Sequence, residues 1–343
     1  MRKSPEDWKL SRAPVCVLLT LAFTIAMVAC SGKKAEAPEA GSQAAQKKAS
    51  AQLNPASLPA DSGPPRSIDA SRAWKYTKEV TAFGARPVGS ANHKKLEAYI
   101  HVHLKGIDVQ DDDFVADTIE GKFPIHNILA KFPGTKDGII VIAGHYDTNY
   151  PFRNNGYVGA NDGGSSTGLL LELADQLRKE KPQGYAVWLL WSDGEEAMKD
   201  WTSTDSLYGT RHLAKVWEQD GTLKKIKAFI VEDMIGDADL NIERDQSSAP
   251  WLESVIYEAA TRLGDQSHFF HRELNIEDDH TPFVQLGVPC ADLIDFDYGY
   301  GNVFWHTPQD TMDKLSPQSL QIVGDVILET IRILNAMPAV PPK

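Results

Sequence analysis

Cysteine is scarce in this chain, which has three in 343 residues. Cys16 and Cys30 lie within or directly after an apolar run near the N-terminus, so the rest of the chain contains Cys290 alone. A single cysteine cannot build a framework of intramolecular disulfides, which excludes the class of small disulfide-stapled folds. Cys290 is predicted to be a small buried residue of a hydrophobic core.

Positive charge is also limited, with 35 lysines and arginines against 47 acidic residues and a formal net charge of -12. No basic patch stands out in the part that is expected to fold, which argues against a nucleic-acid partner. The chain is 42% hydrophobic and 24% charged, a composition that is ordinary for a globular protein with a sizeable core.

One long apolar run is present, the uncharged residues 13–29. It follows a stretch rich in lysine and arginine, which is the layout of a secretory signal. The run ends in Met-Val-Ala and Cys30, and small residues before a cysteine at this place resemble a bacterial lipoprotein signal, in which Cys30 would be lipidated and become the mature N-terminus. The alternative is an uncleaved membrane anchor, because the run is close to the minimum length that spans a bilayer.

The chain therefore divides into three predicted parts. Residues 1–30 are a lipoprotein-type signal peptide, and residues 31–66 are a flexible tether of Ala, Pro, Ser, Gly, Gln and Lys that cannot bury a core. Residues 67–343 are the folded domain. We expect this domain to be exported and anchored to a bacterial cell membrane, on the periplasmic or outer-membrane face.

Helical and strand patterns alternate along the folded domain without an internal repeat. This alternation predicts an α/β fold, a three-layer sandwich whose mixed, mostly parallel central sheet is flanked by helices. Strands are predicted over residues 123–132, 138–144, 185–191, 226–231 and 288–294. Helices are predicted to begin at Ser67 and Asn92 and to cover residues 163–179, 206–217, 251–263 and 316–337.

The predicted strand over residues 185–191 is apolar throughout, which is typical of a strand buried on both faces. It leads into Asp193-Gly-Glu-Glu-Ala197, so Glu195 and Glu196 lie beyond its carboxyl end, where ligands of open α/β sheets bind. Adjacent residues point in different directions. This suits a division of labour in which one carboxylate binds a metal and the other transfers protons.

Other polar side chains also follow strands. His145 and Asp147 come after one strand and are two residues apart, so the carboxylate can buttress the imidazole of a metal ligand. A glycine-rich turn over residues 159–164 presents another acid before a helix. Nitrogen and oxygen donors without a thiolate favour zinc, with one or two ions. The predicted metal ligands are His145, Asp162, Glu196, Asp233 and His306.

This set resembles that of the zinc-dependent exopeptidase superfamily typified by bacterial leucyl aminopeptidases. The resemblance implies that Asp162 bridges two zinc ions. His145 and Asp233 would hold one of them, and Glu196 and His306 would hold the other.

A narrower resemblance is to the glutaminyl cyclase branch of that superfamily. It is carried by residues 193–197, Trp201, residues 205–214, residues 276–283 and Trp305-His-Thr307. These motifs extend over roughly half of the chain. The branch uses a single zinc, held by the equivalents of Asp162, Glu196 and His306.

The resemblance to cyclases also implies roles for other side chains. Glu195 would be the proton shuttle, with Asp233 and Asp278 as hydrogen-bonding partners in the active site. Trp201 and Trp305 would wall a narrow pocket. Without the resemblance, either tryptophan could equally be a core or rim residue.

The sequence departs from the animal cyclases in two places. Where they carry a histidine in the strand after Gly-Val-Pro, this chain has Asp292. Residues 163–168 look more like those of the aminopeptidases.

Two activities fit these residues, both at peptide or protein N-termini, and the cyclase activity is favoured over the aminopeptidase activity. As a cyclase, the protein would convert an N-terminal glutamine to pyroglutamate and release ammonia with one zinc ion. As an aminopeptidase, it would use Glu195 to activate a water molecule and would need a second ion. A binding protein that has lost catalysis should lack Glu195 or a ligand, and this chain lacks neither.

Two further acidic features are given no chemistry. The run Asp111-Asp112-Asp113 is predicted to be a solvated loop, and Asp205 is predicted to cap the helix that follows it.

Overall fold

The computed structural model describes residues 58–59 and 64–338. The predicted signal over residues 1–30, with Cys30, lies outside the described residues, as does most of the predicted tether over residues 31–66. Leu58, within that predicted tether, joins the main hydrophobic cluster, and the carbonyl of Pro59 accepts a hydrogen bond from Arg262. In the described part of the chain, no helix combines the length and apolar character needed to cross a membrane.

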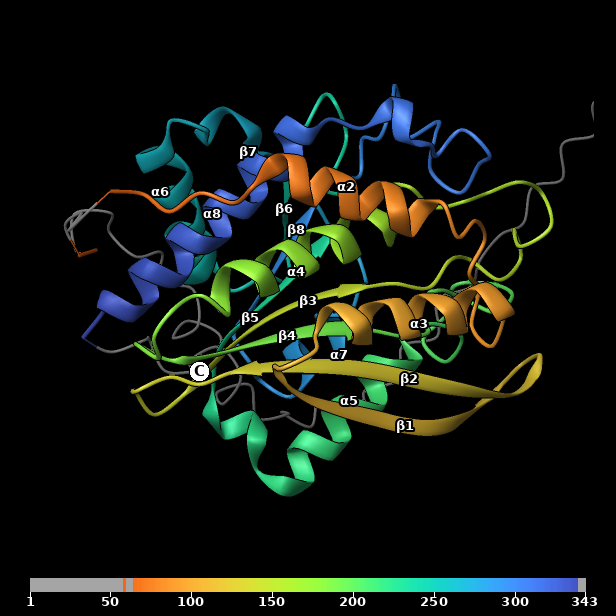
Figure 1. The fold of residues 1–343 in the computed structure, drawn as a ribbon, viewed down its shortest axis with the longest axis horizontal. Helices are drawn as coiled ribbons and strands as arrows, with labels where there is room; N and C mark the ends of the chain where they lie inside the picture. The colour runs from red at the N-terminus through yellow and green to blue at the C-terminus, as the bar shows by residue number, and fades with distance from the viewer. Residues whose placement is uncertain (1–57, 60–63, 339–343) are drawn as a thin grey trace, which may run out of the picture. The chain divides into compact units, whose positions relative to one another are not determined.

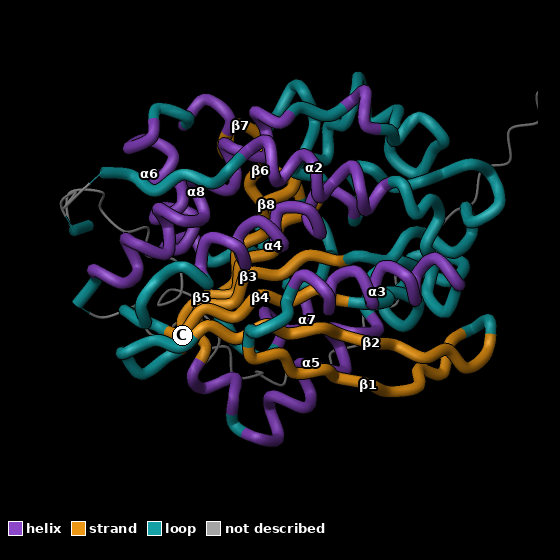
Figure 2. Tube along the Cα trace, in the orientation of Figure 1, coloured by secondary structure: helices purple, strands orange, loops and turns teal. Residues whose placement is uncertain are grey.

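A six-stranded mixed sheet forms the centre of the fold (Figures 1 and 2). The strand order is β1-β2-β4-β3-β5-β8, in which β4, β3, β5 and β8 are parallel and β1 and β2 are antiparallel additions at one edge. The strands are β1 (Asp108–Thr118), β2 (Gly121–Phe132), β3 (Ile139–His145), β4 (Ala186–Ser192), β5 (Ile226–Asp233) and β8 (Cys290–Ile294).

Helices cover both faces of this sheet. One face packs against α2 (Ala70–Thr81), α3 (Ala91–His103), α4 (Gly164–Leu177), α6 (Pro250–Leu263) and α8 (Pro317–Ala336). The other face packs against α5 (Tyr208–Asp220), α7 (Thr281–Gln285) and a 3-10 helix over Thr222–Lys225. The predicted three-layer α/β sandwich with a mostly parallel sheet is confirmed.

The sequence of β3 has no polar face because both faces of the strand are buried. Ile140 and Ile142 belong to the hydrophobic cluster on one side of the sheet, whereas Ile139 and Val141 belong to the cluster on the other side. Successive side chains of a strand alternate between faces, so a strand with both faces covered must be apolar at every position.

Several elements were not expected from the sequence. They include β1, α7, a separate two-stranded parallel sheet of β6 (Ile242–Asp245) and β7 (Phe269–Leu274), and 3-10 helices over Gln266–His268 and Met312–Lys314. The prediction of a solvated loop at Asp111-Asp112-Asp113 is wrong, because these residues lie in β1 and pair with β2, where Asp113 is opposite His126. A strand at the edge of a sheet tolerates such a run because water reaches its side chains.

The parallel strands end at the same edge of the sheet. His145 is the last residue of β3, and Asp233 is the last residue of β5. The loop that carries Glu195 and Glu196 follows β4 directly. The fold therefore brings together residues that are far apart in the sequence, at the edge where α/β proteins bind ligands.

Candidate active site

Asp162 lies at the centre of the polar cluster. Its Oδ1 atom is 3.1 Å from Nε2 of His145, and its Oδ2 atom is 3.2 Å from Nε2 of His306. Asp233 Oδ1 lies 3.2 Å from the same His145 nitrogen, and Glu196 Oε1 lies 3.1 Å from the same His306 nitrogen. Two groups of three donors therefore share Asp162, and within each group the donor atoms lie within 4.8 Å of one another.

These separations suit ligands of a common ion. Two tetrahedral ligands about 2.1 Å from zinc lie roughly 3.4 Å apart, close to the spacing seen in both groups. The donor chemistry also fits, since each group combines one imidazole with two carboxylates.

The charge balance of the site calls for a cation as well. Buried carboxylates crowd around two histidines, and isolated buried negative charge is costly. Burial lowers the pKa of His306, but the charges and hydrogen bonds of Glu196 and Asp162 together outweigh this effect and raise the pKa to about 10. The pKa of His145 is likewise raised well above its usual value against the effect of burial, mainly by Asp233 and Glu195. A bound metal ion would supply the positive charge that the site favours. The buried acids in and near the site include Asp147, Asp162, Glu195, Glu196, Asp233, Asp278, Asp279 and Asp292.

The loop before α4 presents Asp162 to both histidines. Gly163 has a φ of +74°, and a Cβ atom there would lie 2.7 Å from the carbonyl oxygen of Asp147, so only glycine fits. The buried guanidinium of Arg86 donates to the carbonyl oxygens of Gly159 at 2.8 Å and Asp162 at 3.3 Å. The close approach at Gly163 and the hydrogen bonds from Arg86 therefore both fix the conformation of this loop.

The start of α5 holds the loop that carries the two glutamates. The first N–H groups of a helix have no partner within the helix. Here the N–H groups of Leu207 and Tyr208 donate to the carbonyl oxygens of Glu195 and Gly194, each at 2.7 Å. Asp205 does not cap this helix as predicted. Its carboxylate instead accepts N–H groups of the preceding loop, including that of Met198 at 2.9 Å.

Glu195 lies beside the two groups of possible metal ligands. Its Oε2 atom is 3.8 Å from Nδ1 of His145, and its backbone N–H donates to Asp147 Oδ1 at 3.2 Å. Burial raises the pKa of Glu195 well above its usual value. Asp147 Oδ1 also lies 3.5 Å from Nδ1 of His145, the position predicted for a buttressing carboxylate.

A pocket of about 500 Å³ opens onto these residues. Trp305 lines it and stacks on the ring of His306, with centroids 3.9 Å apart. Trp201 also lines it and is 40% exposed, as expected of a residue at the rim. Both tryptophans named from the resemblance therefore line this pocket. Other residues in the pocket wall include Asn149, Pro151, Phe152, Ala197, Lys199, Asp200, Asn275, Ile276, Glu277, Ile294 and Phe296.

Asp278 forms another part of the pocket wall and belongs to a second buried group of acids. Its Oδ2 atom has no hydrogen-bond partner among the described residues. Burial, and after it the negative charge of Asp233, raises the pKa of Asp278 well above the usual value. Behind it, Asp292 lies 3.6 Å from Nδ1 of His280, and His280 contacts Asp245 at 3.2 Å. The aspartate that replaces the histidine of animal cyclases therefore lies close to the site.

Several site residues were missed from the sequence. Asn149 donates to Glu196 Oε2 at 2.6 Å, and the Tyr157 hydroxyl donates to Asp162 Oδ2 at 2.5 Å. Asp310 accepts the backbone N–H of Asn161 at 2.8 Å. These side chains lie in loops without periodicity, and only their proximity to predicted ligands in the sequence could have signalled them.

Comparison with known proteins also indicates a relationship to enzymes that act on peptides. Residues 127–331 match peptidase family M28. The chain belongs to this family. A glutaminyl-peptide cyclotransferase from Drosophila melanogaster is 31% identical over 252 residues, which cover 66% of this chain and 70% of the relative.

Solved structures agree with this assignment. The crystal structure of an Acidobacteriales bacterium glutaminyl cyclase superposes with a TM-score of 0.78, and its sequence is 48% identical to this one. The match covers 81% of this chain and 98% of that chain. A Zn-dependent exopeptidase from Parabacteroides distasonis is 26% identical, with a TM-score of 0.70 over 78% of this chain and 99% of that one. The predicted relationship to zinc exopeptidases and glutaminyl cyclases is confirmed, as is the prediction of an enzyme.

The excess of buried carboxylates predicts that metal removal destabilises the fold. Dialysis against a chelator should lower the midpoint of thermal unfolding by several degrees, because a ligand of the folded state adds stability and each kcal/mol moves the midpoint of a domain of this size class by roughly 2–4 °C. Adding Zn²⁺ back should restore the midpoint, as measured by circular dichroism. Equal midpoints with and without metal would contradict the assignment of a cation to this cluster.

Proposed function

We propose that this M28 protein is a zinc-dependent glutaminyl-peptide cyclotransferase, which converts the N-terminal glutamine of peptides to pyroglutamate. The observation that carries the proposal is the pocket beside the metal-binding groups, in which Glu195 and Asp278 are both buried and both reach the cavity wall. The similarity to glutaminyl cyclases at 31% and 48% identity supports it.

The residues that would hold the metal are those predicted from the sequence. Asp162, Glu196 and His306 would hold the single zinc of a cyclase. When bound, zinc polarises a carbonyl group of the substrate and stabilises the charge that develops on its oxygen.

The reaction requires one proton to move from the attacking nitrogen to the leaving nitrogen. The α-amine of the glutamine attacks its own γ-carbonyl carbon, which forms a C–N bond and breaks the bond to the amide nitrogen, so ammonia leaves. Glu195 would take the proton from the amine and return it to the leaving group. Its buried position and raised pKa suit a group that must both accept and donate a proton near neutral pH.

The rest of the pocket would fix the folded conformer of the substrate. Asp278, whose Oδ2 atom has no hydrogen-bond partner among the described residues, would hold the substrate amide nitrogen, and Asp233 would support the same network. Trp201 and Trp305 would confine the side chain of the glutamine. Because the attack is intramolecular, positioning of this kind supplies much of the rate enhancement.

A second candidate activity is aminopeptidase action. It is favoured by the second complete group of donors, His145, Asp162 and Asp233, which could hold another ion. The similarity to a Zn-dependent exopeptidase also supports it. In that case Glu195 would take a proton from a water molecule as that water attacks the peptide carbonyl.

Two peptides distinguish these activities, one that begins with glutamine and one that begins with leucine. We expect the zinc-loaded enzyme to release ammonia from the glutamine peptide and to leave the leucine peptide intact, as measured by mass spectrometry. A glutamine peptide that remains unchanged, or a leucine peptide that loses its first residue, would contradict the cyclase assignment.

The role of Glu195 predicts the behaviour of Glu195→Gln. This variant should lose about 100-fold or more in kcat, the scale of general acid–base catalysis, while it keeps its zinc. Glu277→Gln is a matched control, because Glu277 is an exposed glutamate at the rim of the same pocket and should be nearly neutral. Near-normal turnover of Glu195→Gln, or loss of its zinc in metal analysis, would count against the assigned role.

We further propose that the enzyme is exported and anchored by a lipid at Cys30, on the evidence of the apolar run and the small residues before that cysteine. Expression of the full chain in a bacterium with labelled palmitate tests this. The wild type should incorporate the label into the membrane fraction, and Cys30→Ser should not. Equal labelling of the two proteins would refute lipidation at Cys30.

A further inference from the structure

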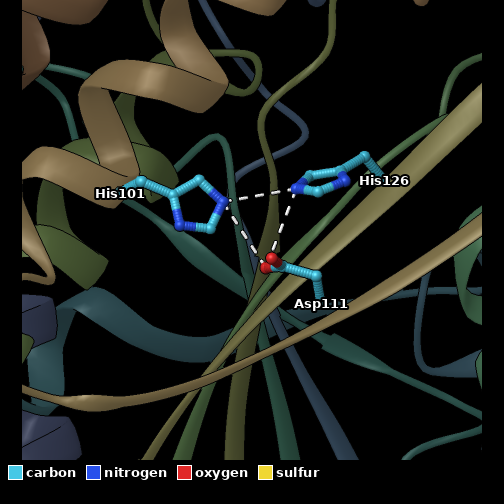
Figure 3. Close-up of side chains that lie close together, drawn as sticks. All are labelled: His101, Asp111 and His126. Atoms are coloured by element: carbon cyan, nitrogen blue, oxygen red, sulfur yellow. Dashed lines mark hydrogen bonds and ion pairs between the residues drawn. The ribbon is translucent and has the colours of Figure 1, made fainter.

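A further group of side chains with suitable metal-ligand atoms lies at the antiparallel edge of the sheet, formed by residues outside the proposed pocket. Figure 3 shows His101 of α3, Asp111 of β1 and His126 of β2 pointing toward one another. The Nε2 atoms of the two histidines are 3.3 Å apart. Asp111 Oδ1 lies 3.4 Å from Nε2 of His101 and 3.7 Å from Nε2 of His126.

We propose that these three residues bind a divalent transition-metal ion of the zinc type. Three atoms with these separations share a point about 2.0 Å from each of them, which matches the roughly 2.0–2.2 Å bonds of zinc to imidazole nitrogen and carboxylate oxygen. The set of two imidazoles and one carboxylate suits zinc and leaves a further coordination position for water.

Asp113 strengthens this assignment. Its carboxylate contacts Nδ1 of His126, on the side of the ring away from the cluster. In the neutral ring, a hydrogen bond from Nδ1–H to that carboxylate leaves the lone pair on Nε2, the atom that faces Asp111 and His101. Metal-binding histidines in proteins are oriented by carboxylates in this way.

The strand pairing explains how the acidic run builds this arrangement. Asp111 and Asp113 are two residues apart in β1 and therefore share a face of the sheet, and Asp113 is directly opposite His126. Asp112 points to the other face, where its Oδ2 atom contacts Nδ1 of His212 at 3.0 Å. The two faces of one strand thus offer a histidine cluster and a single histidine–aspartate pair for comparison.

The site is accessible and would link separate elements. The side chains of His101, Asp111 and His126 are 34%, 37% and 21% exposed, so an ion can reach them from solvent. A bound ion would cross-link α3 to the β1–β2 hairpin. The backbone N–H of His126 also donates to Asp193 Oδ2 at 2.8 Å, which connects this hairpin to the loop that carries Glu195.

Calorimetric titration of the full-length, zinc-loaded enzyme with ZnCl₂ tests the proposal. The wild type should bind one more ion per chain than His101→Asn or His126→Asn, and zinc should raise its unfolding midpoint but not theirs. His212→Asn is the matched control and should bind as the wild type does. Asp113→Asn should retain the site with affinity lowered about 10- to 100-fold, the usual cost of losing such a partner.

His101→Asn is the decisive variant, because the polar contacts of the His101 side chain with described residues all lie within this cluster and the side chain is partly exposed. An unchanged circular dichroism spectrum of that variant would show that it is folded. The proposal is overturned if His101→Asn binds as many zinc ions as the wild type, if the wild type binds no further ion, or if His212→Asn loses the ion as well.

Discussion

Carboxylates crowd the carboxyl ends of β3, β4 and β5, where water has little access. Asp162 faces a histidine on each side, at 3.1 and 3.2 Å, and Glu196 and Asp233 approach the same two histidines. Without positive charge this arrangement would be strongly unfavourable, because buried anions repel one another and lose their hydration. The rest of the site is built around this demand for a cation.

The fold holds these acids in place through the strand ends and through hydrogen bonds to the loops that carry the acids. The parallel strands bring His145, Asp233 and the loop of Glu195 to one edge. The unpaired N–H groups at the start of α5 fix the loop of the two glutamates, and the buried Arg86 fixes the loop of Asp162. In this way backbone groups that would otherwise lack partners hold the acids in place against their mutual repulsion.

Much of this arrangement follows from the sequence. The uninterrupted apolar strands predict a sheet covered on both faces, and acids and histidines directly after those strands must meet at its edge. The support from Arg86, Tyr157 and Asp310 does not follow, because it depends on how irregular loops fold in three dimensions. Strand β1 was missed for a different reason. Its acidic run has no apolar alternation, since one face meets water and histidines rather than a hydrophobic core.

Anomalous X-ray diffraction from crystals grown with Zn²⁺, recorded on both sides of the zinc absorption edge, tests the central claim most directly. A peak is predicted between Asp162, Glu196 and His306. A second peak between His145, Asp162 and Asp233 would favour the two-ion chemistry of an aminopeptidase. If crystals of active enzyme show no zinc peak in contact with Asp162, the buried acids are balanced in some other way and the account of the site is wrong.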